Sequence, residues 1–130
     1  VIVAHSNLTF TQLCRLFFEM KIHHLPILDE SEQIIGIVSA NDALKAYSYY
    51  VPTLATSDDA TVNAQVKIED IMTEHPRVAS PDLPVEAIAK LFTVEKIHSL
   101  PIIENSKLVG IVTSNDLLKV LANHLAELVE

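Results

Sequence analysis

The sequence contains few of the residues that catalytic and metal-binding motifs need. Its 130 residues include two glycines and one cysteine. Two glycines cannot supply a phosphate-binding loop or a nucleophile elbow, and no such motif is present. The six histidines form no His-x-x-x-His pair, and Cys14 has no partner for an internal disulfide. We therefore predict that the chain is not an enzyme, with no catalytic residue, no catalytic cofactor and no metal. The helical spacing of Phe10, Leu13, Cys14 and Phe17 predicts that Cys14 is a small buried residue in a reducing cytosol.

Positive charge is also scarce. Nine Lys and Arg residues stand against 17 Asp and Glu, and the net charge is −8. No basic stripe is available to displace counterions, so the charge argues against nucleic acid as a partner. No apolar run approaches the roughly 18 residues of a membrane span. We expect a cytoplasmic protein that contacts neither nucleic acid nor membrane. A small anionic ligand stays possible because it needs only a local group of donors.

What the sequence does contain is an internal repeat. The segment Lys21–Ile27 returns as Lys96–Ile102, and Gly36–Asp42 returns as Gly110–Asp116. Residues 3–28 match 78–103 at 11 of 26 positions, and residues 34–45 match 108–119 at 7 of 12. Two copies favour a pair that packs face to face, since a solenoid usually needs at least three repeats.

Each copy has the pattern strand, helix, strand, strand, helix. The strands are short and apolar, and each pair is separated by a polar turn. The fold class that we predict is therefore α/β, of α+β type: two β-α-β-β-α repeats whose small mixed sheets pack in pseudo-twofold symmetry. The predicted boundaries are 1–50 for repeat 1, 51–65 for a linker and 66–130 for repeat 2. Ile68–Met72 has no counterpart before repeat 1, so we expect its N-terminal element to be missing and the chain to be a fragment of a longer protein.

These motifs resemble those of a tandem CBS-domain pair, the Bateman module. The resemblance rests on Asp70-Ile71-Met72, on Leu-Pro-Ile in both copies, and on Gly-Ile-Val-Ser/Thr followed by Asp. It implies a regulatory module that binds an adenosine derivative, such as AMP, ADP, ATP or S-adenosylmethionine, in clefts between the two repeats. It also implies a homodimer, for which adjacent apolar residues such as Leu16 and Phe17 supply surface. Some members of the family have no known ligand, so a ligand-free architectural dimerisation module of a larger protein is the alternative.

Two pairs of residues are the first candidates for ligand binding. Ser39-x-x-Asp42 and Thr113-x-x-Asp116 each have the spacing of a capping box, which satisfies the first free amides of a helix. The resemblance adds a second role, in which the Asp accepts hydrogen bonds from ribose hydroxyls and the helix start faces a phosphate. The pattern by itself leaves both roles open.

A second set of candidates follows from the resemblance and would contact the base or the phosphates. It consists of Val3, Ile22, His23, Arg77, Val78, Ile97 and His98. The family geometry would place Ser39 and Asp42 opposite Arg77, Val78, Ile97 and His98, and Thr113 and Asp116 opposite Val3, Ile22 and His23. Because Arg77 aligns with Ile2, we expect the two clefts to be unequal and the one with Arg77 to bind more tightly.

Overall fold

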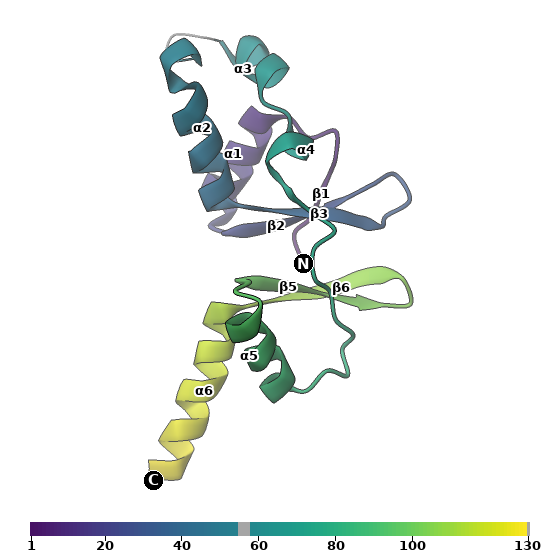
Figure 1. The fold of residues 1–130 in the computed structure, drawn as a ribbon, viewed down its shortest axis with the longest axis vertical. Coiled ribbons are helices and arrows are strands. Elements are labelled where there is room, and N and C mark those ends of the chain that lie inside the picture. Colours follow the sequence, from purple (N-terminus) through teal and green to yellow (C-terminus); the bar gives the residue numbers. More distant parts are fainter. Residues whose placement is uncertain (55–57, 130) are drawn as a thin grey trace. The chain divides into compact units, whose positions relative to one another are not determined.

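The computed structural model describes residues 1–54 and 58–129 and consists of two compact units (Figure 1). One unit comprises Ile2–Pro76, and the other comprises Arg77–Glu130 together with Val1. Each unit contains one copy of the repeat, and each is described by itself.

The first unit is a four-stranded mixed sheet with helices. Its elements are β1 (Ala4–His5), α1 (Phe10–Met20), β2 (His24–Leu28), β3 (Ile34–Ser39), α2 (Ala40–Leu54), α3 (Asp59–Gln65), α4 (Ile68–Ile71) and β4 (Thr73–Glu74). The strand order is β1-β2-β3-β4, in which β1 runs parallel to β2 and the other neighbours are antiparallel. The predicted order of strand, helix, strand, strand and helix is present in β1 to α2.

Local sequence signals define where α1 begins and ends. Thr9 and Gln12 form a reciprocal capping box: the Gln12 amide donates to the Thr9 hydroxyl at 3.3 Å, and the Thr9 amide donates to the Gln12 side chain at 3.0 Å. The helix stops at Lys21, whose φ of 53° is left-handed.

The prediction that Cys14 is buried was wrong. Leu13 takes the core-facing position, and Cys14 lies in a groove against α2, where partial burial raises the pKa of its thiol.

The stretch after α2 packs onto the first repeat. Val66 and Ile68 are each only 2% exposed and belong to the core that includes Leu13, Leu25 and Val38. The Asn63 side chain joins α3 to α1, since it accepts from the backbone amide of Thr11 and donates to the Thr11 hydroxyl, both at 2.9 Å. The predicted linker, 51–65, thus holds the end of α2 and all of α3.

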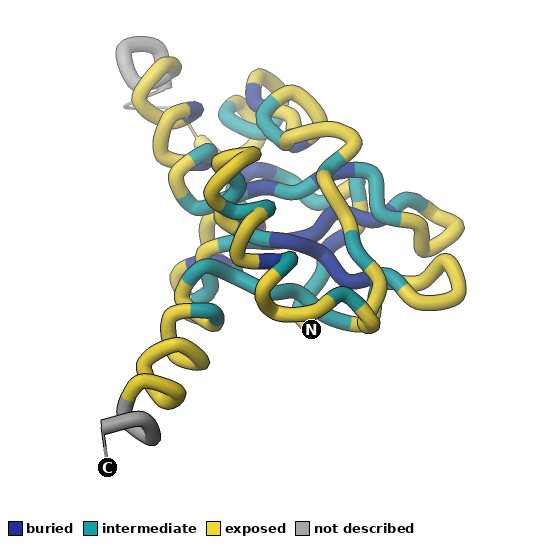
Figure 2. The backbone as a smooth tube through the Cα atoms, turned by 60° about the horizontal axis from the view of Figure 1, so that its bottom comes forward, coloured by how far each residue is buried: buried dark blue, intermediate teal, exposed yellow. Residues whose placement is uncertain are grey.

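The second unit has the same plan with fewer elements. It contains α5 (Val85–Val94), β5 (Ser99–Glu104), β6 (Lys107–Thr113) and α6 (Ser114–Val129). β5 and β6 form an antiparallel pair, and Ala79 makes a parallel bridge to Ile102 at the position where the first unit has β1. Ile88, Leu100 and Ile102 form its core. Figure 2 shows that α6 is exposed along most of its described length.

The predicted fold class is confirmed, with small sheets and helices in each repeat. Within residues 1–54 and 58–129, no helix combines the length and the apolar character that a bilayer crossing requires.

Candidate functional site

The start of α2 is formed by Ser39 and Asp42. The Ser39 amide donates to Asp42 Oδ2 at 2.9 Å, and the Asp42 amide donates to the Ser39 hydroxyl at 3.0 Å. Both residues are half-buried. This reciprocal pair satisfies two backbone amides at the positive end of the helix, so the predicted capping role is confirmed.

The start of α6 repeats this arrangement with Thr113 and Asp116. The Thr113 amide donates to Asp116 Oδ2 at 2.8 Å, its hydroxyl donates to the same oxygen at 3.0 Å, and the Asp116 amide lies 3.2 Å from the Thr113 hydroxyl. Among the described residues, neither Asp42 nor Asp116 accepts a hydrogen bond at its other oxygen, Oδ1. Each helix start therefore keeps one carboxylate oxygen that can accept from hydroxyl groups of a ligand.

Each helix start lies beside the Ile-His pair of its own repeat. The Ala40 amide donates to the backbone oxygen of His23 at 2.8 Å, and the Ser114 amide donates to that of His98 at 3.2 Å. The strand register explains this, because the residue after each histidine pairs with Ser39 or Thr113. The structure thus brings His23 to Ser39 and Asp42 in the first unit, and His98 to Thr113 and Asp116 in the second.

The side chains of these pairs have two different surroundings. Ile22 and Ile97 are half-buried and pack against the core of their own repeat, whereas His23 and His98 are exposed. Ile22 and His23 also line an apolar groove of about 520 Å³ between α1 and α2. Asp42 does not line that groove.

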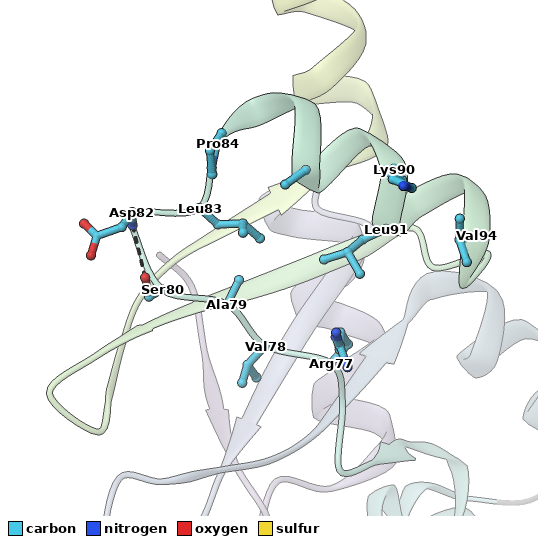
Figure 3. Close-up of a pocket in the computed structure, with 11 residues that line it drawn as sticks. Arg77, Val78, Ala79, Ser80, Asp82, Leu83, Pro84, Lys90, Leu91 and Val94 are labelled. Atoms are coloured by element: carbon cyan, nitrogen blue, oxygen red, sulfur yellow. Dashed lines mark hydrogen bonds between the residues drawn. The ribbon is translucent and has the colours of Figure 1, made fainter.

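Arg77 and Val78 lie in a different part of the second unit. They line a pocket of about 620 Å³ beside α5, which Figure 3 shows with Leu83 and Leu91. Arg77 Nε is 3.5 Å from Glu95 Oε2, and both side chains are partly exposed. Neither Thr113 nor Asp116 lines this pocket. The volume is in the range of small-molecule sites, and the lining is mostly apolar.

Sequence reasoning missed the α5 side of this pocket. Ala87, Lys90, Leu91 and Val94 recur with the spacing of one helix face and line it. Lys90 lines the same pocket as Arg77 and adds a second positive charge to it. The sequence signal for Lys90 was its alignment with Arg15, because both repeats then carry a basic residue at this position.

Val3 is half-buried and directly precedes β1. The pairing of site residues from different repeats stays a prediction.

Comparisons with known proteins identify both repeats. A family model described as the CBS domain matches residues 1–49 and 68–123. The L-aspartate semialdehyde sulfurtransferase of Methanocaldococcus jannaschii is 32% identical over 89% of the chain and 20% of the relative. The uncharacterized protein MJ1426 of the same organism is 28% identical over 92% of the chain and 85% of the relative. The chain spans about a fifth of the length of the first of these relatives.

Solved structures have the same fold. The CBS domain pair of protein MJ0100, in complex with 5'-methylthioadenosine and S-adenosyl-L-methionine, is 31% identical with a TM-score of 0.77. The match covers 95% of this chain and 89% of that one. A second structure, CBSX2 in complex with AMP, is 22% identical with a TM-score of 0.75, covers 95% and 88% of the two chains, and supports the fold alone.

Proposed function

Because the chain belongs to the CBS-domain family and is a tandem pair of such domains, we propose that it is a regulatory module that binds an adenosine derivative. The observation that carries the proposal is the likeness to the MJ0100 domain pair, whose complex contains two adenosine derivatives. That likeness extends over nearly the whole of both chains. The candidate ligands are S-adenosylmethionine, 5'-methylthioadenosine, AMP, ADP and ATP.

The chemistry of the helix starts supports the same proposal. A ribose carries two neighbouring hydroxyls, and a carboxylate oxygen with no other partner accepts from them in a charge-assisted bond. Asp42 and Asp116 each present such an oxygen beside the first amides of a helix. In this proposal the ribose binds there, and Ile22 or Ile97 contributes apolar surface for the base.

The remaining predicted residues take secondary roles in the proposal. His23 and His98 are exposed beside the helix starts and can donate to a ligand's polar tail. Val3, Arg77 and Val78 lie at the start of their own repeats, and we propose that they contribute to the base or phosphate ends of a ligand. The curated relatives named as enzymes are more than four times as long as this chain, and we assign none of their reactions to it.

Calorimetry tests the proposal directly. The chain is titrated with each of the five candidates and, in parallel, with guanosine monophosphate. We expect saturable heat with at least one adenosine derivative, at a Kd on the order of micromolar, or about −8 kcal/mol. A rise in melting temperature should accompany it, since the ligand binds only the folded state. No heat and no thermal shift at about 1 mM of any candidate would contradict the proposal and favour the ligand-free dimerisation module.

One observation favours the alternative, a homodimerisation module. Phe18, Leu44 and Leu118 are 84%, 66% and 62% exposed, and they lie on the helices rather than on loops. Leu44 lines the α1/α2 groove, and Leu118 lines a matching groove of about 770 Å³ between α5 and α6. Phe17, by contrast, is buried, so the expected dimer surface lies one residue farther along α1. Twin apolar faces suit an isologous contact between two copies.

Light scattering tests the dimer independently of any ligand. We expect twice the 14.4 kDa chain mass at micromolar concentration. Phe18→Glu should give a monomer, because it places a charge in the apolar contact. Met20→Glu is the matched control, since Met20 is exposed on the same helix and does not line the groove. A wild-type chain that is a monomer would remove dimerisation from the proposal and leave ligand binding untouched.

A further inference from the structure

Met72 joins the segment after α3 to the sheet of the first unit. Its sulfur and Cγ fill the space over Gly36 in β3: a Cβ added at Gly36 would overlap the sulfur and come within 2.9 Å of Cγ. Gly36 is buried, and Met72 is half-buried and packs against the first core. The thioether is therefore in direct contact with β3, because residue 36 has no side chain to keep it away.

Few other contacts hold β4 to β3. The strand has two residues, each paired with one residue of β3, and both of their side chains are exposed. His75 follows directly with a φ of 48°, in the left-handed region that is unfavourable for a residue with a side chain. A two-residue ladder that faces solvent opens easily. The position of β4 thus depends on Met72, which directly precedes the strand and packs on the core.

On its other side Met72 is continuous with α4. Its amide donates to the Ile68 backbone oxygen at 3.0 Å and closes this single turn of helix. Ile68 is 2% exposed, and Ile71 packs against the same core. A helix of four residues is not stable by itself, so α4 keeps its place through these packed side chains. A change that weakens the Met72 contact should therefore affect β4 first, while Ile68 still anchors α4.

We propose that Met72 is a redox-sensitive modification site, whose oxidation by a peroxide releases β4 from β3. In this step the thioether sulfur attacks one peroxide oxygen, the O–O bond breaks and an S–O bond forms. The sulfur loses two electrons and becomes a sulfoxide, and hydrogen peroxide is reduced to water. Because Met72 is half-buried rather than fully buried, a small peroxide reaches it in the folded chain. The inference is independent of the proposed ligand.

The sulfoxide oxygen has two possible positions. If it stays in place, it lies among packed apolar atoms and loses the hydrogen bonds that water would give it. If it turns to water, it draws the side chain away from Gly36 and uncovers that residue. Two backbone pairs are then all that hold the strand, so the second outcome detaches β4.

Met20 is the matched control, as the second methionine of the chain. It is 49% exposed in the last turn of α1 and lies outside the first core. Its oxidation adds a polar group to a surface side chain, so it should proceed faster and leave the fold unchanged. The Cys14 thiol is also oxidisable, so every protein in the comparison carries Cys14→Ser.

Dilute hydrogen peroxide is added to this protein and to its Met72→Leu and Met20→Leu forms, and peptide mass mapping follows each methionine. We expect oxidation of Met72 to lower the melting temperature by about 4 °C or more, with or without Met20→Leu. Met72→Leu keeps an apolar side chain of similar volume, so it should fold and lose less than about 2 °C. Amide exchange should become faster at residues 36–37 and 73–74 and stay unchanged in β5 and β6.

Reduction tests whether the modification itself is the cause. The two methionine sulfoxide reductases, one for each epimer, should restore the melting temperature. A loss that persists once Met72 is a thioether again, or that survives in Met72→Leu, would overturn the inference. It would also be overturned if Met20 were fully oxidised while Met72 stayed untouched, or if Met72 were oxidised with no change in melting temperature or exchange.

Discussion

The two repeats have closely related sequences and differ in how much of each is covered. The first has eleven residues in its buried cluster, and the second has three, among the residues that the structure describes. Matched positions show the effect: Val38 is fully buried, whereas its counterpart Val112 is only half-buried. The side chains are the same, so the difference comes from the elements around them. Residues 58–74 pack onto the first repeat, and among the described residues β6 of the second repeat pairs with β5 alone.

The comparison shows that a repeat pattern predicts which face of an element is apolar and does not predict what covers it. Ala4 and Ala79 occupy the same position in the two repeats, yet Ala4 is buried and Ala79 is half-exposed. Burial depends on tertiary neighbours as well as on periodicity. The substitutions below test how far residues 58–74 account for the difference.

The largest effect is expected from Ile68→Ala. Ile68 is 2% exposed in the first core, and removing most of its side chain should cost about 2–5 kcal/mol of unfolding free energy. Urea denaturation measures the loss. Amide exchange should become faster in β2 and β3 and stay unchanged in β5 and β6, because the residue supports only the first unit.

Val109→Ala is the control at an exposed apolar position of the second repeat. Val109 is 51% exposed, so the change should alter the free energy of unfolding by no more than about 0.5 kcal/mol. Equal losses for the two variants would mean that α4 does not belong to the first core, and the comparison between the repeats would fail.

Gly36→Ala and Gly110→Ala form the next pair. A methyl group at Gly36 meets Met72 and lies 3.1 Å from the Thr73 backbone oxygen, so we expect a loss of about 1–3 kcal/mol. At Gly110 the same change should be within about 0.5 kcal/mol. Thermal denaturation of both variants checks this.

The double variant Gly36→Ala with Met72→Ala identifies the cause. It should be more stable than the sum of the two single losses predicts, because the overlap is removed. Strict additivity would show that the backbone of β4, rather than the Met72 side chain, sets the cost.

Much of the fold was predictable because the signals are local. The strand, helix, strand, strand, helix order follows from short apolar runs, polar turns and capping boxes. The first repeat confirms it, and the second repeat has helix, strand, strand, helix with a bridge at Ala79 in place of the first strand. The capping of α2 and α6 by Ser39-x-x-Asp42 and Thr113-x-x-Asp116 was predicted from spacing alone, and the hydrogen bonds confirm it.

The contacts that depend on distant residues were not predictable in the same way. Nothing in the pattern around Cys14 distinguishes the core from the groove, because Phe17, one turn later, belongs to the core and also lines the groove. The attachment of α3 through Asn63 and Thr11 needs a contact 52 residues apart in sequence. Periodicity carries no information on such a pair, and the α5 pocket with Lys90 was missed for the same reason.

Asp42→Asn and Asp116→Asn test the comparison at the candidate site. Each should weaken binding of the adenosine derivative by about 1–3 kcal/mol, or roughly 5- to 150-fold, because an amide replaces the charged acceptor. The melting temperature should change little, since Asn caps a helix nearly as well as Asp. We expect the larger loss at Asp42, which is half-buried where Asp116 is exposed.

Calorimetry and thermal denaturation on the same samples separate the two roles of these carboxylates. A fall in melting temperature with unchanged affinity would assign both residues to capping alone. Equal affinity losses at both positions would show that the difference in burial between the two carboxylates does not change their contribution to ligand binding.

The smallest effect is a pH dependence at Asp58, which caps helix α3 in the first unit. The Thr61 backbone amide donates to Asp58 Oδ1 at 2.9 Å, and this bond, with help from the Thr61 hydroxyl, holds the pKa of Asp58 below its usual value. A lowered folded-state pKa means that the carboxylate contributes stability above its unfolded pKa of about 3.9. That contribution is lost as the pH falls through the lower folded-state value.

Asp58→Asn keeps the cap but removes the titration, so the melting temperatures of the two proteins should agree near pH 7 and differ in their decline below about pH 4. Because the carboxylate is fully exposed, the difference should shrink in 1 M salt. Exchange protection should change in α3 and not in α5 or α6. A difference that is constant with pH would show that the geometry of the cap, and not its charge, fixes α3 on the first repeat.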